Sequence, residues 1–367
     1  MALAPEGVKQ LAAKGAELVV EAGAGEPAGM ADEAYRQAGA RIEDDAEKLF
    51  ASADVLVKVE APEELPGGGH EVDRLREGAT LIGCLRPLER PELAQRLAAR
   101  GVTAFALELM PRITRAQSMD VLSSMATVAG YHAVVIAASL LPRLFPMLVT
   151  AAGTLTPARV LVVGAGVAGL QAIATARRLG AVVEAYDTRP AVKEQVQSLG
   201  ARFVELPIET ADAEDKGGYA KAQSEEFYAR QRALLGERVR AADVVITTAQ
   251  VPGQPAPVLI DAETVSGMRS GAVIVDLAAE RGGNCALTQP GRDIVASGVT
   301  ISGPLGLPSR HAFHASQLYG RNVTTFLLHL LKEGQLHLDL DDELTRGPLL
   351  THRGEISNEA VRGRLAG

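Results

Sequence analysis

Three glycines and one acidic residue carry the clearest chemical signal in this chain. Gly164, Gly166 and Gly169 stand in the order GxGxxG, and Asp187 follows 18 residues after the last of them. This spacing is typical of a turn that brings backbone N–H groups to a dinucleotide pyrophosphate, while the acid accepts hydrogen bonds from the adenosine ribose. Because a carboxylate repels a 2′-phosphate, Asp187 favours NAD(H) over NADP(H). Arg189, two residues further on, weakens that preference.

The flanking segments predict the elements that such a turn requires. Residues 160–163 are an apolar, mostly β-branched run of strand length, residues 170–179 have the period of a helix, and residues 181–186 form a second apolar run. Strand, glycine turn, helix, strand and acid therefore follow one another, which is the context in which GxGxxG predicts dinucleotide binding. Three isolated glycines would indicate only an ordinary tight turn.

A second polar group lies in the passage ELMPRITRAQSMDVLSS. Its members, Arg112, Gln117, Asp120 and Ser123, are separated by five, three and three residues. The last three share one face if a helix has begun by Gln117, with Arg112 in the loop before it. From the residues alone, such a set is more often a solvated first helical turn than a functional site.

Other candidates for chemistry are few. His311 and His314 with Cys285 lack the spacing of metal ligands, which favours structural histidines and no metal site. The sequence has no nucleophile elbow, paired-carboxylate motif or HExxH motif. This is compatible with a nicotinamide enzyme, because hydride transfer without an accompanying proton needs two positioned carbon atoms and neither an acid nor a base.

Composition excludes several classes of protein. A chain of 367 residues with 47% hydrophobic and 22% charged residues is typical of a globular protein with two domains. The net charge of −8 leaves no basic footprint for nucleic acid. Two isolated cysteines and no signal peptide indicate the cytoplasm. Residues 121–142 carry no charge, but their polar residues and the missing aromatic belts favour a buried interdomain helix over a membrane span.

The whole chain predicts an α/β fold with two Rossmann-like, doubly wound parallel-sheet domains joined by long helices. Residues 1–131 and 312–367 are expected to form the first domain, and residues 132–311 the NAD(H)-binding domain. The first domain should contain strands at 16–21, 55–60, 80–85 and 103–107 and helices at 5–14, 31–38 and 91–100. Beyond 160–163 and 181–186, the second should contain strands at 202–205, 244–247, 272–276 and 300–302. The polar segment 209–219 reads as a mobile loop.

Five blocks closely resemble the NAD(H)-binding alpha subunit of proton-translocating NAD(P) transhydrogenase, and the likeness covers nearly the whole chain. The blocks are RITRAQSMDVLSSMATVAGY, GAGVAGLQAIATARRLGA with Asp187, DKGGYAKAQSEEF, TTAQVPGQPAPVLI and DLAAERGGNC. The resemblance implies direct hydride transfer between NADH on this subunit and NADP⁺ on a partner. It further implies a homodimer, an NADP(H)-binding beta subunit, a membrane-spanning alpha-2 subunit, and a cytoplasmic location at the inner face of the cell membrane.

The resemblance also implies roles for individual residues. Arg112, Gln117, Asp120 and Ser123 match the motif that gathers around the nicotinamide ring, and Tyr219 matches the mobile-loop tyrosine. The cofactor-binding residues that it predicts are Gly164, Gly166, Val167, Ala168, Gly169, Asp187, Thr188, Arg189, Gly218, Ala249 and Gln250. Gln250 departs from the family, because an apolar contact to the adenine is common there, and Gln223 stands where a methionine is usual.

Two alternative functions remain open. The first is alanine dehydrogenase, a related family that this chain also resembles, and Lys58 matches its substrate-carboxylate lysine. That family places a catalytic histidine where this chain has Cys84, Leu85 and Arg86, which argues against amino-acid oxidation and for a structural Lys58. The other alternative is a non-catalytic NAD(H)-sensing protein. Both families usually begin with an extra strand, so the first domain is expected to lack one.

Overall fold

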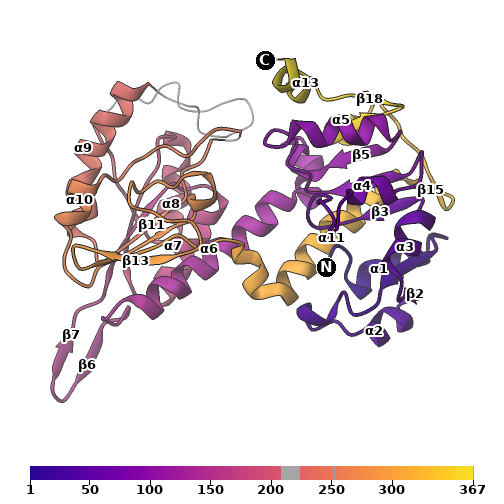
Figure 1. Ribbon diagram of the computed structural model, residues 1–367. Coiled ribbons are helices and arrows are strands. Elements are labelled where there is room, and N and C mark those ends of the chain that lie inside the picture. Colours follow the sequence, from indigo (N-terminus) through magenta and orange to yellow (C-terminus); the bar gives the residue numbers. More distant parts are fainter. Residues whose placement is uncertain (208–223, 252, 367) are drawn as a thin grey trace. The chain divides into compact units, whose positions relative to one another are not determined.

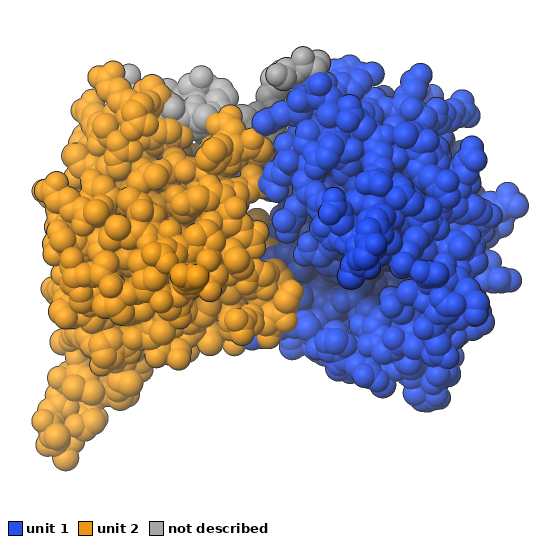
Figure 2. All heavy atoms as spheres, in the orientation of Figure 1, with its two compact units in different colours: residues 1–125, 311–367 blue, residues 126–310 orange. Residues whose placement is uncertain are grey.

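The computed structural model describes residues 1–207, 224–251 and 253–366. The chain divides into two compact units, which Figure 2 draws in different colours. Unit 1 comprises Met1–Met125 and His311–Gly367, and unit 2 comprises Ala126–Arg310. Each unit contains a sheet whose core strands are parallel, with helices between the strands (Figure 1). The predicted α/β, Rossmann-like fold class is therefore confirmed.

Unit 2 is built on a seven-stranded sheet with the order β10-β9-β8-β11-β12-β14-β13. Its strands are β8 (Arg159–Val163), β9 (Val182–Tyr186), β10 (Arg202–Phe203), β11 (Val244–Thr247), β12 (Val273–Asp276), β13 (Asp293–Ala296) and β14 (Val299–Ser302). All neighbours are parallel except β13, which pairs antiparallel with β14 and was not predicted. From β8 the chain adds β9 and β10 on one side of the sheet, and it then returns to place β11, β12 and β14 on the other side. This reversal makes the carboxyl ends of β8 and β11 the topological switch point, where open α/β sheets bind ligands.

Both faces of this sheet are covered, because successive side chains of a strand point to opposite faces. Val160 and Val162 of β8 pack into one core, with α7 (Val167–Arg178), α8 (Lys193–Ser198) and part of α6 (Val121–Leu140). Leu161 and Val163 of β8 pack into the other, with α9 (Glu225–Ala241) and α10 (Ala262–Ser266). The short segments η4 (Pro190–Val192), η5 (Ala279–Arg281) and η6 (Leu307–His311) complete the described helices of unit 2.

Helix α6 is long and apolar enough to cross a membrane by length and composition, yet only 33% of its most apolar window is buried. The buried positions Val134 and Ala137 lie three residues apart on one face, and Leu141, directly after the helix, packs into the same core. Tyr131 and Val135 are exposed on another. The expectation of a buried helix therefore holds for one face, while most of the other positions are half-buried.

A β-hairpin of β6 (Leu148–Thr150) and β7 (Gly153–Leu155) projects from unit 2 (Figure 1). Every residue in both strands is exposed, including Leu148, Leu155 and Val149, whose exposed fraction is 76%. No strand was predicted in this segment. An isolated two-stranded hairpin is only marginally stable in water, and no described residue covers this one.

Unit 1 contains a five-stranded sheet with the order β18-β17-β5-β4-β3. Its strands are β3 (Val55–Val57), β4 (Thr80–Gly83), β5 (Thr103–Ala106), β17 (Leu349–His352) and β18 (Glu355–Ile356). Strands β3 to β5 are parallel, and β17 adds antiparallel to β5. The four strands predicted for this domain do not form a single parallel sheet, because β1 (Leu18–Glu21) pairs with β2 (Ala40–Glu43) in a sheet of its own. A further hairpin joins β15 (Leu331–Lys332) to β16 (Gln335–Leu336).

The longest helix of unit 1 is α11 (Ala312–Leu330). The other described helices of unit 1 are α1 (Pro5–Ala12), α2 (Asp32–Gln37), α3 (Ala46–Ser52), α4 (Glu71–Arg74), α5 (Pro91–Ala99), α12 (Glu343–Arg346), α13 (Glu359–Ala366) and the short η1 (Glu26–Ala28), η2 (Leu107–Leu109) and η3 (Thr114–Met119). Helix α11 packs against α1, η1 and η3. Phe326 of α11 meets Phe105 of β5 edge to face, with ring centroids 5.2 Å apart. Gly320 lets α11 approach the start of α1, since a Cβ there would lie 2.8 Å from the Ala4 nitrogen.

Candidate functional site

Two of the three predicted glycines are required by the fold itself. The turn between β8 and α7 places Gly164 at φ +98°, a conformation that favours glycine. A Cβ at Gly164 would also lie 2.5 Å from Oγ1 of Thr248. A Cβ at Gly169, in the first turn of α7, would lie 1.9 Å from the carbonyl oxygen of Gly164. Gly164 therefore allows the segment after β11 to contact the turn, and Gly169 allows α7 to pack directly against it.

Gly166 differs, because the described residues give no packing reason for it. Its φ is −73°, and a Cβ there would have one neighbour within 4 Å, the Arg189 guanidinium at 3.9 Å. Gly166 is the N-cap of α7, and Val167 and Ala168 follow as the first helical residues. Open space in front of a helix N-terminus is what a pyrophosphate needs in order to approach backbone N–H groups. The turn therefore fits a dinucleotide.

Helix α6 also contacts the start of α7. A Cβ at Gly130 would lie 2.1 Å from the carbonyl oxygen of Ala168, so α6 packs directly on this turn. Gly130 was not singled out from the sequence. A glycine inside an otherwise apolar helix was the available signal, since such a residue costs helix stability and marks a close approach.

Asp187 lies directly after β9 and its carboxylate is fully engaged. Oδ2 accepts hydrogen bonds from the Ala165 nitrogen at 2.7 Å and from Nη2 of Arg189 at 2.9 Å. Oδ1 accepts from the nitrogen and from Nε of Arg189, at 2.8 and 2.9 Å. These four bonds fill the four acceptor positions of a carboxylate. A ribose hydroxyl would compete with Arg189 for these oxygens.

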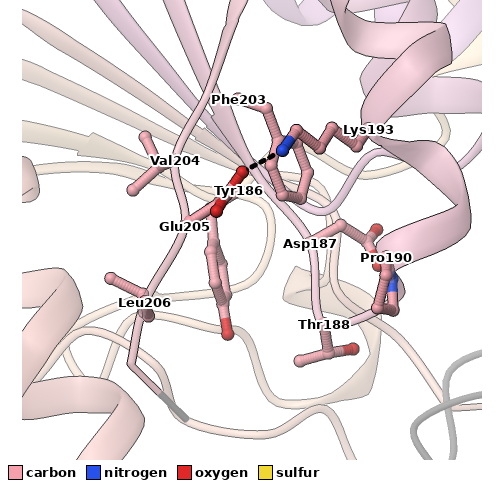
Figure 3. A pocket seen from close by; sticks show the side chains of 9 residues that line it. All are labelled: Tyr186, Asp187, Thr188, Pro190, Lys193, Phe203, Val204, Glu205 and Leu206. Atoms are coloured by element: carbon pink, nitrogen blue, oxygen red, sulfur yellow. Dashed lines mark hydrogen bonds and ion pairs between the residues drawn. The ribbon is translucent and has the colours of Figure 1, made fainter. Parts of the chain in front are cut away.

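A pocket lies beside Asp187 at the carboxyl ends of β9 and β10. Figure 3 shows its lining residues, which are Tyr186, Asp187, Thr188, Pro190, Lys193, Phe203, Val204, Glu205 and Leu206. Lys193 and Glu205 are joined by an ion pair. Burial raises the pKa of Tyr186 to about 12, so its phenol stays neutral near pH 7. Apart from Asp187 and Thr188, none of these residues was a predicted contact, because β10 approaches β9 only in the folded sheet.

Ala249 and Gln250 follow β11, on the other side of the switch point. Oγ1 of Thr248 donates to the carbonyl oxygen of Gly164 at 3.0 Å, which ties this segment to the glycine turn. Nε2 of the exposed Gln250 donates to the carbonyl oxygen of Leu277 at 3.0 Å. Gly218 and Tyr219, together with Gln223 and the whole of the expected mobile loop at 209–219, lie outside the described residues.

The four polar residues predicted near the nicotinamide all belong to unit 1, but they do not share a helix face. Gln117 lies in η3 (Thr114–Met119), a 3-10 helix, and Arg112 lies between η3 and η2 (Leu107–Leu109); both side chains are exposed. Helix α6 begins only at Val121, because the backbone of Asp120 is extended. The Asp120 carboxylate accepts hydrogen bonds from the Ser123 nitrogen at 2.9 Å and from its Oγ at 2.6 Å. Asp120 and Ser123 thus meet in a helix cap.

The alternative site residues have structural partners. Lys58 forms an ion pair with Glu71. Burial raises the pKa of Cys84 to about 12, so its thiol is neutral near pH 7. Within the described part of the chain, no three His, Cys, Asp or Glu side chains gather as a metal site.

A doubly wound unit with a glycine turn at its switch point, joined in one chain to a second α/β unit, defines the class of the Rossmann-like two-domain proteins. The model of the alanine dehydrogenase/PNT N-terminal domain matches residues 1–129, and that of the C-terminal domain matches residues 133–359. The chain belongs to this family.

The family includes transhydrogenase alpha subunits and alanine dehydrogenases, and this chain is more similar to the former. The first portion of the NAD(P) transhydrogenase alpha subunit of Rhodospirillum rubrum is 49% identical over 370 residues, which cover 100% of this chain and 96% of that protein. A solved transhydrogenase structure from Sinorhizobium meliloti has a TM-score of 0.84 at 44% identity, covering 98% of this chain and 95% of that one. The alanine dehydrogenase of Halomonas elongata is 31% identical, covering 98% of this chain and 92% of that protein. The resemblance to transhydrogenase alpha subunits is confirmed, and alanine dehydrogenase is the more distant relative.

Proposed function

We propose that this chain is the NAD(H)-binding component of a proton-translocating NAD(P) transhydrogenase. It would bind NADH and pass hydride directly to NADP⁺ held by a partner subunit. The observation that carries the proposal is the open approach at Gly166, where the described residues give no packing reason for a glycine. A bound pyrophosphate supplies the missing reason. Full-length similarity to transhydrogenase alpha subunits supports the same reading.

The proposal divides the residues by task. The glycine turn with Val167 and Ala168 would bind the pyrophosphate, Asp187 and Thr188 the ribose, and Ala249 with Gln250 the adenosine end. Bound NAD(H) supplies the hydride chemistry at its nicotinamide ring. Arg112, Gln117, Asp120, Ser123 and Tyr219, which the resemblance assigns to that ring, would orient it. Orientation suffices because direct transfer between two carbon atoms requires no proton at a side chain.

The proposed partners follow from the same resemblance. They are an NADP(H)-binding beta subunit and a membrane-spanning alpha-2 subunit, which would hold the chain at the cytoplasmic face of the membrane. Catalysis, with Si/Re stereospecificity, would require the beta subunit. We also propose a homodimer. The exposed apolar residues Leu148, Val149 and Leu155 of the β6–β7 hairpin support a contact with a second copy, since the described residues of one copy leave them uncovered.

A mixing experiment tests the proposed function. The purified chain is combined with the NADP-binding component of a transhydrogenase, and hydride transfer from NADH to an NADP⁺ analogue is followed by absorbance. Transfer that depends on both proteins is expected. A chain that binds NADH but transfers no hydride would instead be the NADH-sensing protein, and a chain that does not bind NADH would disprove both functions.

Lys58 is the one feature that favours the alanine dehydrogenase alternative, and its surroundings weaken it. Its ammonium group is paired with Glu71, and Cys84 with Leu85 occupies the place where that enzyme has its histidine. A neutral thiol is a poor proton acceptor. NADH production from alanine and NAD⁺ by the chain alone would nevertheless establish the alternative.

A further inference from the structure

A buried network connects the carboxyl end of β12 to the glycine turn two strands away. It begins at Asp276, the last residue of β12, whose side chain is completely buried. Oδ1 accepts hydrogen bonds from Oγ1 of Thr247 at 2.9 Å and from the Ala278 nitrogen at 3.0 Å. Oδ2 accepts from the Asn284 nitrogen at 2.7 Å, the Cys285 nitrogen at 3.1 Å and Oγ1 of Thr288 at 2.6 Å. One carboxylate thus holds both β11 and the loop after β12.

The loop after β12 is shaped to wrap around this carboxylate. Gly283 has φ +87°, and a Cβ there would lie 2.7 Å from Oδ2 of Asp276 and 2.9 Å from Cβ of Thr288. No larger residue fits without moving the network. The next residue, Asn284, is therefore delivered to one defined position, and it too is completely buried.

The Asn284 side chain pairs with the backbone of Ala249 in both directions. Its Oδ1 accepts from the Ala249 nitrogen at 3.0 Å, and its Nδ2 donates to the carbonyl oxygens of Ala249 and Pro257, each at 2.8 Å. Pairing with the N–H and the C=O of one residue defines the orientation of the amide. Ala249 directly follows Thr248, whose hydroxyl donates to the carbonyl oxygen of Gly164. A continuous set of bonds therefore runs from Asp276 through Asn284 to the glycine turn.

We propose that Asn284, held in place by Asp276, is a positioning residue for the dinucleotide. It fixes Ala249, and through Thr248 the glycine turn, in the shape that receives the adenosine and pyrophosphate half of NAD(H). This role rests on the proposed function and adds to it a residue that lies outside the predicted site. Leaving buried backbone groups without hydrogen-bond partners is energetically costly. Loss of the Asn284 side chain should therefore allow Ala249 and the segment around it to move.

The test compares Asn284→Ala and Asn284→Asp with a matched control, Asp243→Asn. Asn284→Asp keeps the size of the side chain but cannot donate to the two carbonyl oxygens. Asp243 is also buried and lies at the amino end of β11, where it accepts from the Arg159 nitrogen at 2.9 Å and from Arg143 at 2.6 Å. All variants are studied as full-length chains at a temperature where circular dichroism shows them folded.

Titration with NADH and with ADP-ribose gives the first readout. Both Asn284 variants should bind each ligand about tenfold more weakly, while Asp243→Asn should change either dissociation constant by less than about twofold despite lower stability. Equal losses in the Asp243 control, or normal binding by a folded Asn284→Ala, would overturn the proposal.

Amide hydrogen exchange of residues 164–169 without nucleotide gives a second readout. Exchange should accelerate in the Asn284 variants and stay unchanged in Asp243→Asn, since only the former release the turn. Unchanged exchange in the Asn284 variants would overturn the coupling. Failure of the unmutated chain to bind NADH would refute the proposed function instead, and the exchange measurement would still decide whether Asn284 holds the turn.

Discussion

Asp187 and Arg189 form an ion pair at the carboxyl end of β9 in which Nε and Nη2 of Arg189 each donate to one carboxylate oxygen, both at 2.9 Å. Both side chains are largely buried. A bidentate pair of a guanidinium and a carboxylate is stronger than an ion pair with a single hydrogen bond. The residue predicted to exclude NADP(H) is therefore neutralised by a cation that could itself attract a 2′-phosphate.

This pair predicts how cofactor preference responds to mutation. The unmutated chain should bind NADH at least about tenfold more tightly than NADPH. Asp187→Ala should narrow that ratio, whereas Arg189→Gln should widen it, because the cation that neutralises Asp187 is gone. Arg202→Gln, which breaks an exposed pair with Glu184, is the control and should leave the ratio unchanged. Titrations of both nucleotides decide the matter, and equal affinities in the unmutated chain would contradict the assignment.

The glycine turn predicts opposite effects for two similar substitutions. Gly169→Ala places a methyl group 1.9 Å from a carbonyl oxygen and should destabilise the fold by about 2 kcal/mol or more. Gly166→Ala meets only the Arg189 side chain at 3.9 Å, so the free energy of unfolding should change by less than about 0.5 kcal/mol. NADH affinity should nevertheless fall about tenfold in Gly166→Ala. Urea unfolding and NADH titration measure the two effects. Normal NADH binding by Gly166→Ala would remove the main support for the site.

Gln117 and Asp120 should separate hydride transfer from binding. Gln117 is exposed on η3, so Gln117→Asn should preserve the fold and the NADH dissociation constant within about threefold, while transfer to an NADP-binding partner falls about ten- to a hundredfold. Asp120→Asn should have an intermediate effect on both. Asp120→Ala should also cost about 1 kcal/mol of stability through loss of the α6 cap.

Nucleotide titration and single-turnover mixing provide both constants for these variants. Thr114→Ser, an exposed change on the same 3-10 helix, is the control. Normal transfer by Gln117→Asn would mean that the passage is only a solvated helix start.

Glu108 should make stability fall as pH rises. Burial raises the pKa of this carboxyl to about 7, and its Oε2 has no hydrogen-bond partner among the described residues. Between the unfolded pKa, about 4.5, and pH 7, the folded state binds more protons than the unfolded state, so stability decreases across that window and levels off above it. The total is about 3 kcal/mol.

Urea unfolding from pH 4.5 to 8 checks this prediction with Glu108→Gln as the comparison. The neutral amide should remove the decline that Glu108 contributes between pH 4.5 and 7. Identical pH profiles for both proteins would mean that the carboxyl is not perturbed by its burial.

The β6–β7 hairpin should be part of a homodimer contact. Val149→Asp places a charge on its most exposed apolar residue and should shift a dimer toward monomer, because desolvating that charge in an apolar interface is costly. Val295→Asp on β13 is the control, since Val295 is 72% exposed on a different strand of unit 2. Light scattering after size exclusion gives the oligomeric state. A Val149→Asp dimer as stable as the unmutated one would place the contact elsewhere.

Local signals in the sequence determined the centre of unit 2. Residues 160–163 and 244–247 are short runs rich in β-branched residues, which favour strands. The positive φ of Gly164 is a conformation that residues other than glycine rarely adopt. Strand, turn and helix could therefore be predicted without knowing the rest of the chain. The elements that were missed have weaker local patterns. β2, with the sequence ARIE, and β17, which pairs with β5 from about 245 residues away, are strands because of their partners.

Only the tertiary structure decided how the site residues are used. Periodicity placed Gln117, Asp120 and Ser123 on one helix, but α6 begins only at Val121, and Asp120 caps it by accepting a hydrogen bond from the Ser123 nitrogen. The sequence identified Asp187 as an acceptor, yet its acceptor positions are filled by Arg189 and Ala165 across a turn. The side chain of Asn284 can bond the backbone of Ala249 only because β11 and β12 pair in the sheet. Spacing along the chain records local periodicity, whereas hydrogen bonds between distant segments exist only after folding brings them together.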